Sequence, residues 1–470
     1  MRGQIGKAEV LCLFSAQKLL LLPGQRVAAL HAAGQVQETR EIGAVLGEAR
    51  PGSRGVSRPR ILGLILAGGK GERLYPLTKD RSKPAVPFGG KYRIADFVLS
   101  NFINSQIYSL YILVQYKSQS LIDHIRRGWR FGGLVDDHFI ITVPPQMRWG
   151  ESWYRGTADA VFQNLNLIRD VDPTLVAIFG ADHIYRMDLQ QMIAAHLARR
   201  ADVSVAALPV PIETASSFGI LGTDADGRIL GWDEKPKEPH PMPGDPTRAL
   251  SSMGNYIFTT DVLVDSLVED ARRSTDHDFG RTIIPELYPF ARVFAYDFLE
   301  NDIPDIQPGE ERGYWRDVGT IEAYWKANMD LLGVRPALNL DNPHWPILAS
   351  PLASPAARIM DGTIEDVLFG EGSIVRGATV RRSVIGQGVK LEEGAVIQDS
   401  IIMDNTTVGR GARVTRTIID RFNVIEPGAV IGEDAEEPPE NGVLDPSGIT
   451  VIARGATRVR GGTTSMPVLR

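Results

Sequence analysis

A glycine-rich loop followed by two basic residues forms the first group that could do chemistry. The loop begins directly after the apolar run Ile61–Ala67 and includes Gly68 and Gly69. Glycines let backbone N–H groups approach an anion closely, and Arg73 and Lys83 offer the donors that suit a polyphosphate. The pattern is neither a Walker A loop nor a dinucleotide-binding fingerprint, so a simple tight turn remains an equal alternative for the loop alone.

Two aspartates form the second group. Asp182 follows the apolar run Leu175–Ala181, which would place it at the carboxyl edge of a parallel sheet, where ligands of α/β proteins bind. Asp317 lies in a Trp-Arg-Asp-Val-Gly segment. A helix N-cap or turn for Asp182, and a surface salt bridge to Arg316 for Asp317, are the alternatives. The sequence alone gives no distance between the two carboxylates.

Short apolar runs alternate with amphipathic segments in the part of the chain that carries these residues. The runs Ile61–Ala67, Leu110–Val114 and Leu175–Gly180 are typical of buried parallel strands, and Ser118–Arg127 and Asp188–Arg199 have helical patterns. Strands alternating with helices predict βαβ units and a mostly parallel, Rossmann-like sheet.

Two proline-rich segments and a set of short hairpins interrupt this pattern. Gly219–Leu221 and Ile229–Trp232 flank a turn at Asp224–Gly227, which predicts a hairpin inserted in the α/β domain. Pro236–Pro246 is interpreted as a loop, and residues 337–360 as a linker.

The C-terminal third contains a repeat with a period of 17 residues, marked by tetrads that begin at Gly377, Gly394, Gly411 and Gly428. Aliphatic residues in two further registers keep the same period, so that successive aliphatics are spaced six, six and five residues apart. This spacing predicts a left-handed parallel β-helix of hexapeptide-like repeats. The registers are Leu368, Ile385, Ile402 and Ile419, and Ile374, Leu391, Val408 and Ile425.

The predicted divisions are an N-terminal extension (1–60), an α/β domain (61–336), the linker (337–360) and the β-helix with a mobile C-terminal tail (361–470). The extension carries nine basic and four acidic residues, whereas the whole chain of 470 residues has a net charge of −6. It is interpreted as poorly ordered or as a misassigned start. Its apolar stretches are too short to span a membrane.

Composition narrows the function classes further. The acidic net charge argues against a general nucleic-acid binder. The single cysteine, Cys12, excludes an intramolecular disulfide and a cysteine-cluster metal site. We expect a cytoplasmic protein, because this cysteine usage fits a reducing compartment.

The motifs together resemble the ADP-glucose pyrophosphorylases of bacterial glycogen and plant starch synthesis, over about residues 61–455. The resemblance begins with Leu66–Asn101 (LAGGKGERLYPLTKDRSKPAVPFGGKYRIADFVLSN). It continues in Trp153–Val161 (WYRGTADAV), Gly180–Tyr185 (GADHIY), Asp233–Pro236 (DEKP), Ser252–Gly254 (SMG), His277–Gly280 (HDFG) and Tyr314–Asn328 (YWRDVGTIEAYWKAN).

The resemblance implies that a phosphate oxygen of glucose 1-phosphate attacks the α-phosphorus of ATP and expels diphosphate. No protein nucleophile is needed, so catalysis rests on alignment and on neutralising the polyphosphate charge. By resemblance, Arg73 and Lys83 grip the triphosphate, and Asp182 and Asp317 hold Mg²⁺, which prefers oxygen ligands. The remaining positions matched to substrate binding are Gly68, Gly69, Gln115, Tyr154, Gly156, Gly219, Glu234, Lys235 and Ser252.

The resemblance also implies a homotetramer that is regulated by a sugar-phosphate activator and a nucleotide or phosphate inhibitor. Four arginines match the effector pocket, namely Arg81, Arg93, Arg421 and Arg454. Asp80 and Pro87 depart from the pattern of members that respond to fructose 1,6-bisphosphate, which have Lys and His there. Because Asp80 would repel a phosphate, we expect an altered choice of activator.

Three other functions stay open at this point. One is a nucleotidyltransferase for another base or sugar, and the second is a regulatory subunit without turnover. The third is an acyltransferase, since β-helices of this kind often belong to that class. The regulatory subunit is disfavoured because all four catalytic candidates are present, and the acyltransferase because residues 361–435 contain no histidine.

Overall fold

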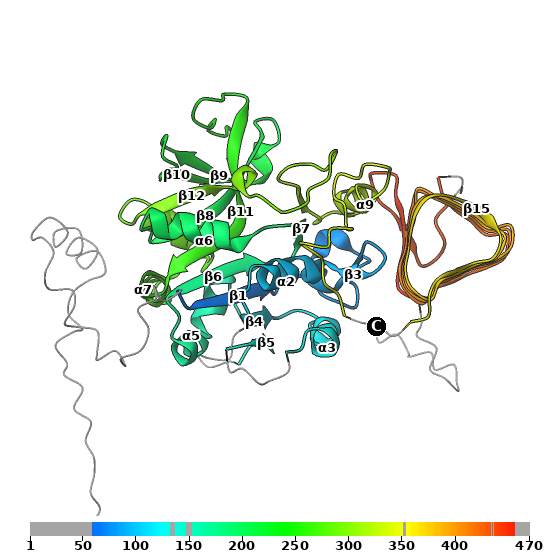
Figure 1. Cartoon of the computed structure of the whole chain (residues 1–470), viewed down its shortest axis with the longest axis horizontal. Coiled ribbons are helices and arrows are strands. Elements are labelled where there is room, and N and C mark those ends of the chain that lie inside the picture. The colour runs from blue at the N-terminus through cyan, green and yellow to red at the C-terminus, as the bar shows by residue number, and fades with distance from the viewer. Residues whose placement is uncertain are drawn as a thin grey trace, which may run out of the picture.

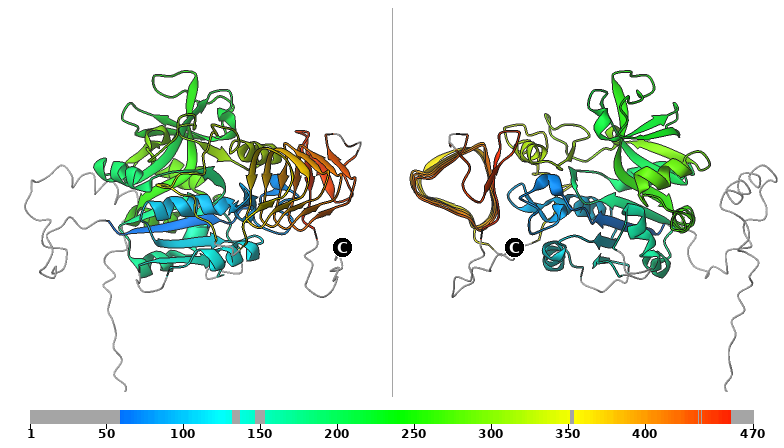
Figure 2. Two further views of the ribbon diagram at one scale, coloured as in Figure 1. Left: turned by 45° about the vertical axis from the view of Figure 1, so that its right-hand side comes forward. Right: turned by 180° about the vertical axis from the view of Figure 1, so that it is seen from behind.

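The computed structural model of the chain describes residues 59–131, 137–146, 153–350, 354–433, 435 and 437–455. An α/β domain lies beside a coil of stacked strands with a triangular outline (Figures 1 and 2). The predicted N-terminal extension lies outside the described residues except for its last two, and so does the predicted C-terminal tail after residue 455.

The main sheet of the α/β domain has parallel strands at its centre. β1 (Ile61–Ala67) pairs in parallel with β4 (Ser109–Val114) and β6 (Leu175–Gly180), and β4 pairs in parallel with β5 (Phe139–Val143). On the far side of β6, β11 (Arg248–Thr259) runs antiparallel. The other strands extend the sheet beyond β11: β8 (Val203–Pro211), β9 (Gly219–Thr223), β10 (Ile229–Glu234) and β12 (Val293–Asp297).

Both faces of this sheet are buried, as the continuous apolar runs predict. Successive side chains of a strand point to opposite faces, and in β6 Val176 and Ile178 join one core while Ala177 and Phe179 join the other. Helices cover each face. The helices of the first core are α4 (Thr157–Phe162), α5 (Leu165–Val171), α7 (Thr260–Asp270) and α8 (Ile284–Leu287), and those of the second are α2 (Ile94–Asn104), α3 (Gln119–Gly128) and α6 (Leu189–Ala198).

The C-terminal domain is a parallel β-helix, as predicted. One face consists of β14 (Arg358–Ile359), β16 (Ile374–Val375), β18 (Lys390–Leu391), β21 (Thr407–Val408) and β24 (Val424–Ile425). The others consist of β15 (Gly362–Phe369), β17 (Ala378–Ile385), β19 (Val396–Gln398), β20 (Ile401–Ile402), β22 (Arg413–Thr415), β23 (Thr417–Ile419), β25 (Val430–Gly432), β26 (Gly442–Leu444) and β27 (Thr450–Ile452).

The four tetrad glycines occupy equivalent corners of the coil, each with a φ between 61° and 73°. A left-handed backbone of this kind favours glycine. The predicted register is wrong in the first coil, because Phe369, and not Leu368, stands opposite Ile385, and Val375, and not Ile374, stands opposite Leu391. That coil is therefore one residue shorter than the period.

The two domains share a core, and the segment predicted as a linker contributes to it. Leu338 and Ile347 are buried beside Tyr324 of α9 (Ile321–Met329) and Ile401 and Ile418 of the β-helix. The indole Nε1 of Trp325 donates to the carbonyl of Asp399, at 3.0 Å. Residues 337–350 thus pack against the domains, whereas residues 355–360 are exposed.

Candidate active site

The glycine-rich loop lies at the carboxyl end of β1, next to the central strands. Gly71 has a φ of +65°, and its carbonyl accepts a hydrogen bond of 2.8 Å from Thr78 Oγ1. A Cβ placed on Gly68 would lie 3.3 Å from Gln115 Oε1, whereas one on Gly69 would meet no atom within 4 Å. Gln115 in turn donates to the carbonyl of Tyr154, at 3.2 Å. The backbone at Gly69 is therefore open to a ligand.

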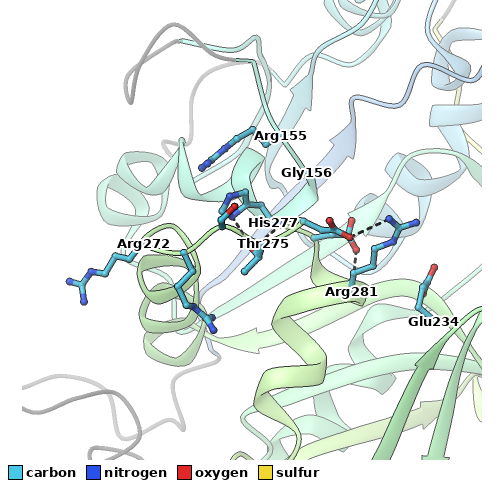
Figure 3. A pocket seen from close by; sticks show the side chains of 11 residues that line it. Arg155, Gly156, Glu234, Arg272, Thr275, His277 and Arg281 are labelled. Atoms are coloured by element: carbon cyan, nitrogen blue, oxygen red, sulfur yellow. Dashed lines mark hydrogen bonds and ion pairs between the residues drawn. The ribbon is translucent and has the colours of Figure 1, made fainter.

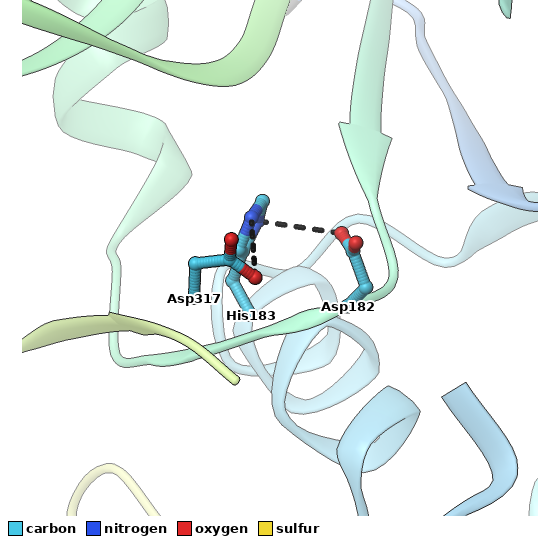
Figure 4. Close-up of side chains that lie close together, drawn as sticks. All are labelled: Asp182, His183 and Asp317. Atoms are coloured by element: carbon cyan, nitrogen blue, oxygen red, sulfur yellow. Dashed lines mark ion pairs between the residues drawn. The ribbon is translucent and has the colours of Figure 1, made fainter. Parts of the chain in front are cut away.

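The two predicted carboxylates lie close together, although 134 residues separate them in the sequence (Figure 4). Asp182 comes just after β6, and Asp317 ends β13 (Trp315–Asp317), which pairs antiparallel with β7 (His183–Tyr185). In this ribbon Asp317 stands directly opposite His183. The ligand atoms of Asp182, His183 and Asp317 all lie within 4.8 Å of one another. This arrangement can hold a cation.

Lys83 connects the glycine-rich segment to these carboxylates. Its Nζ donates to Asp317 Oδ1 at 2.8 Å and to Asp182 Oδ2 at 3.1 Å, and its side chain is only 7% exposed. Burial acts to lower the pKa of Lys83, but the two carboxylates outweigh it, and the pKa is raised. Lys83 is therefore a fixed positive charge at the edge of the sheet.

The same contacts keep Asp182 ionised. Burial acts to raise the pKa of this carboxyl, but His183 and Lys83 lower it by more, so that the pKa lies well below its usual range. His183 Nδ1 lies 3.5 Å from Asp182 Oδ1, and its Nε2 lies 4.0 Å from Asp317 Oδ1. His183 was not among the site residues predicted from the sequence. Its place directly after Asp182 was the available signal.

Arg73 differs from Lys83 in being largely exposed to solvent. Its side chain is 72% exposed, and its Nη2 lies 3.9 Å from Asp317 Oδ2. It stands on the short helix η2 (Glu72–Leu74), on the solvent side of the carboxylates. A guanidinium in this position can reach a ligand seated over the glycine-rich loop.

Four of the residues predicted for substrate binding form a second group. Glu234 on β10 is opposite Gly219 on β9, and a Cβ on Gly219 would lie 2.8 Å from Glu234 Oε2 and 3.9 Å from Ser252 Cβ. Lys235 follows with a φ of +53°, and its N–H donates to the carbonyl of Phe218, at 3.0 Å. Its side chain is exposed at the end of the hairpin.

Glu234 and Gly156 line one open cavity of about 860 Å³, together with residues 272–278 (Figure 3). Tyr154 lies near this cavity but is only 7% exposed, and its hydroxyl accepts a hydrogen bond of 2.9 Å from Asn164 Nδ2. The Tyr154 ring therefore packs in the core, and its backbone carbonyl accepts the hydrogen bond from Gln115.

A second pocket, of about 460 Å³, lies at the junction of the domains. Arg93, Arg421 and Arg454 line it, as does Asp80. Burial lowers the pKa of Arg421 to about 9, and the charges of Arg93 and Arg81 add to this effect, so guanidinium groups crowd together beside the pocket. Such crowding favours a bound anion.

Arg81 is not among the described residues that line this pocket. It is 1% exposed and forms an ion pair with Asp420, which is fully buried, across the domain interface. Its Nε also donates to the carbonyl of Leu77, at 3.0 Å. The pairing with Asp420 could not be read from the sequence.

Comparisons with known proteins agree with this architecture. The profile of the nucleotidyl transferase family matches residues 62–333, and that of the GlmU-like C-terminal hexapeptide region matches residues 355–452. Within the described part of the chain, every helix is too short or too polar to cross a membrane.

Three relatives, all named glucose-1-phosphate adenylyltransferase, match most of the chain. That of Thermodesulfovibrio yellowstonii is 52% identical over 85% of this chain and 97% of its own. Those of Thermus thermophilus and of Anaeromyxobacter sp. are 49% and 48% identical, each over 84% of this chain and 98% of its own. The chain belongs to the glucose-1-phosphate adenylyltransferase family of nucleotidyl transferases.

Proposed function

We propose that this chain transfers the adenylyl group of ATP to glucose 1-phosphate, forming ADP-glucose and diphosphate. The observation that carries the proposal is the position of Lys83 between Asp182 and Asp317, beside a glycine-rich loop whose backbone is open at Gly69. A nucleoside triphosphate needs this combination of backbone N–H groups, fixed positive charge and cation ligands. The names of the relatives supply the base and the sugar.

The residues at this edge fit a divalent cation, as nucleotidyltransferases generally require. Asp182 is held ionised, and Asp317 and His183 offer further ligand atoms within 4.8 Å. We propose Mg²⁺, because it prefers carboxylate oxygens. When bound, it would neutralise charge on the triphosphate and on the departing diphosphate.

The side chains of the chain itself supply binding and alignment. Lys83 and Arg73 bind the triphosphate, with Gly68 and Gly69 donating from the backbone and Gln115 supporting that loop. Lys235 and Glu234 bind glucose 1-phosphate, with Gly156, Gly219, Tyr154 and Ser252 shaping that site. Aligning the phosphate oxygen with the α-phosphorus supplies most of the rate acceleration, since no covalent step on the protein is needed.

Regulation and assembly are part of the same proposal. The junction pocket with Arg93, Arg421 and Arg454 would bind a sugar-phosphate activator or a nucleotide or phosphate inhibitor, with Arg81 held beside it by Asp420. The enzyme would act as a cytoplasmic homotetramer in glycogen synthesis. Residues 61–336 would be the catalytic unit, 337–360 the connection and 361–470 the β-helix.

A diphosphate-release assay with glucose 1-phosphate and each of ATP, dTTP, UTP and GTP tests the reaction. We expect release with ATP that exceeds release with the other three, and ADP-glucose as the sugar product. A preference for another base would replace the proposal with a different nucleotidyltransferase. Binding of ATP without turnover would indicate a regulatory subunit.

A further inference from the structure

The wall of the larger cavity contains a buried, hydrogen-bonded pair of side chains to which the reaction proposed above assigns no role. His277 Nδ1 lies 2.8 Å from Asp270 Oδ2, and the two side chains are 4% and 3% exposed. Thr275 Oγ1 donates to the other oxygen of Asp270 and accepts a hydrogen bond of 3.1 Å from the His277 N–H. The pair joins the last residue of α7 to the loop that follows it.

This pair holds His277 in an unusual backbone conformation. His277 has a φ of +49°, which a residue other than glycine adopts only at a cost in free energy. The conformation turns the His277 carbonyl toward α4, where it accepts from the N–H groups of Ala158 (2.8 Å) and Asp159 (3.2 Å). The side-chain contact with Asp270 therefore fixes the direction of a backbone acceptor.

The carbonyl of His277 also fills the space that a side chain at position 156 would need. A Cβ on Gly156 would lie 2.3 Å from that carbonyl oxygen. Next to it, Thr157 Oγ1 donates to Asp278 Oδ2 at 2.8 Å and accepts from the N–H of Phe279 at 3.0 Å. These contacts join Gly156 and the first turn of α4 to the segment that begins η5 (Phe279–Ile283).

Both joined segments line the cavity that contains Glu234 (Figure 3). A Cβ on Gly280 would lie 3.7 Å from Glu234 Oε2, so η5 begins against the carboxylate that we assign to the sugar phosphate. The glycine-rich loop has its own contacts, with Thr78 and Gln115, and Gln115 donates to the carbonyl of Tyr154 and not to the groups that His277 contacts.

We infer that His277, held by Asp270, is a positioning residue for the glucose 1-phosphate site. It fixes the loop at Gly156 and the start of η5 relative to each other and to Glu234. This inference rests on the proposed function, and it predicts an effect on one substrate only. A misplaced wall lowers the affinity for the sugar phosphate, whereas the triphosphate contacts stay in place.

Two substitutions separate the side-chain contact from the backbone conformation. His277→Gly tolerates the positive φ but removes the bond to Asp270. His277→Asn also tolerates that φ, and its side-chain amide can still donate to Asp270. The control is His196→Asn, because His196 is equally buried and bonded to Ser204 Oγ at 2.9 Å, but packs in the core on the other face of the sheet.

The KM values for both substrates and the thermal midpoint of unfolding are measured for the parent and the three variants. We expect His277→Gly to raise the KM for glucose 1-phosphate about tenfold or more, with the KM for ATP within about twofold, and His277→Asn to restore most of the loss. His196→Asn should leave both KM values unchanged even if it lowers the midpoint of thermal unfolding.

An unchanged KM for glucose 1-phosphate in His277→Gly, or equal rises in both KM values, would overturn the inference. Calorimetric titration with glucose 1-phosphate distinguishes a failure of the inference about His277 from a failure of the proposed reaction. A parent chain that binds the sugar phosphate without turnover contradicts the proposed reaction, and the dissociation constants of the variants then test His277. A parent that does not bind it overturns both.

Discussion

The ammonium Nζ of Lys83 lies 2.8 Å from Oδ1 of Asp317, although the two residues are 234 positions apart in the chain. The same Nζ reaches Asp182 at 3.1 Å, so one buried cation links three segments of the domain. The nearby ammonium group favours the ionised form of Asp182. The site is thus charged and ordered before any substrate is bound, which reduces the reorganisation that catalysis would otherwise require.

Replacing either carboxylate by its amide should abolish most turnover without unfolding the protein. In Asp182→Asn and Asp317→Asn we expect kcat to fall by about 10²-fold or more, because charge stabilisation at the transferring phosphate is lost. Steady-state kinetics at saturating substrates measure the loss, and circular dichroism checks the fold. Asp137→Asn, at an exposed pair with Arg60, serves as the control. Near-normal turnover in Asp182→Asn would remove it from the site.

The lowered pKa of Asp182 also predicts how stability depends on pH. Because the folded pKa lies below that of the unfolded chain, the ionised carboxylate stabilises the fold at every pH above the unfolded value of about 3.9. This contribution is lost as the pH falls below that value toward the folded pKa. The difference in unfolding free energy between the parent and Asp182→Asn should therefore be constant from about pH 8 to 5 and shrink below about pH 4.

Urea unfolding at a series of pH values measures this difference. A gap that varies between pH 8 and 5 would show that a group other than the Asp182 carboxyl contributes to it. A gap that persists unchanged to pH 3 would contradict the assigned direction of the shift.

Substitution of Lys235 tests its proposed contact with glucose 1-phosphate. Lys235→Gln keeps the length of the side chain and removes its charge, so the KM for glucose 1-phosphate should rise about tenfold, as one lost charge-assisted hydrogen bond would require. The neighbouring variant Lys237→Gln, in the same exposed loop, should change it by less than about twofold. An equal response of both lysines would show a diffuse electrostatic effect and no specific contact.

The strands around the site could be predicted, because buried parallel strands leave continuous apolar runs such as Ile61–Ala67. The position of Asp182 followed from the same rule, since it comes just after such a strand. The closeness of Asp317 to Asp182 could not be predicted, because it depends on the pairing of the three-residue strands β7 and β13. The sequences of such short strands do not indicate their partner. His183 could have been selected from its place directly after Asp182, but its contact with Asp317 depends on the same pairing.

The repeat shows a different limit. A period of 17 residues predicted the β-helix correctly, but the first coil is shorter by one residue, and this moves Leu368 out of the interior register. Phe369 packs in the coil instead, and Leu368 packs against the core shared with the α/β domain. The first coil packs both against the next coil and against the α/β domain, so its aliphatic residues do not follow one simple period.

The choice of activator should depend on Asp80, which lines the junction pocket with Arg93, Arg421 and Arg454. Asp80→Lys replaces a repulsive charge by an attractive one, so the concentration of fructose 1,6-bisphosphate for half-maximal activation should fall about tenfold. Asp226→Lys, which reverses the same charge at an exposed position in the β9–β10 turn, is the control. A strong response of the parent chain to this compound would contradict the role of Asp80.

Arg81 and Asp420 offer a test of how the β-helix is attached. Arg81 is 1% exposed and Asp420 is fully buried, so Asp420→Ala would leave a buried guanidinium without its counter-charge. Breaking such a pair costs about 3–5 kcal/mol, and the thermal midpoint should fall accordingly. The double variant Arg81→Met with Asp420→Leu removes both charges and should recover much of the loss. If the pair of Arg81 and Asp420 served only to bind an effector, Asp420→Ala would lower activation and leave the thermal midpoint unchanged. Calorimetric scans and activation curves of the same three proteins therefore distinguish an interdomain clamp from an effector ligand.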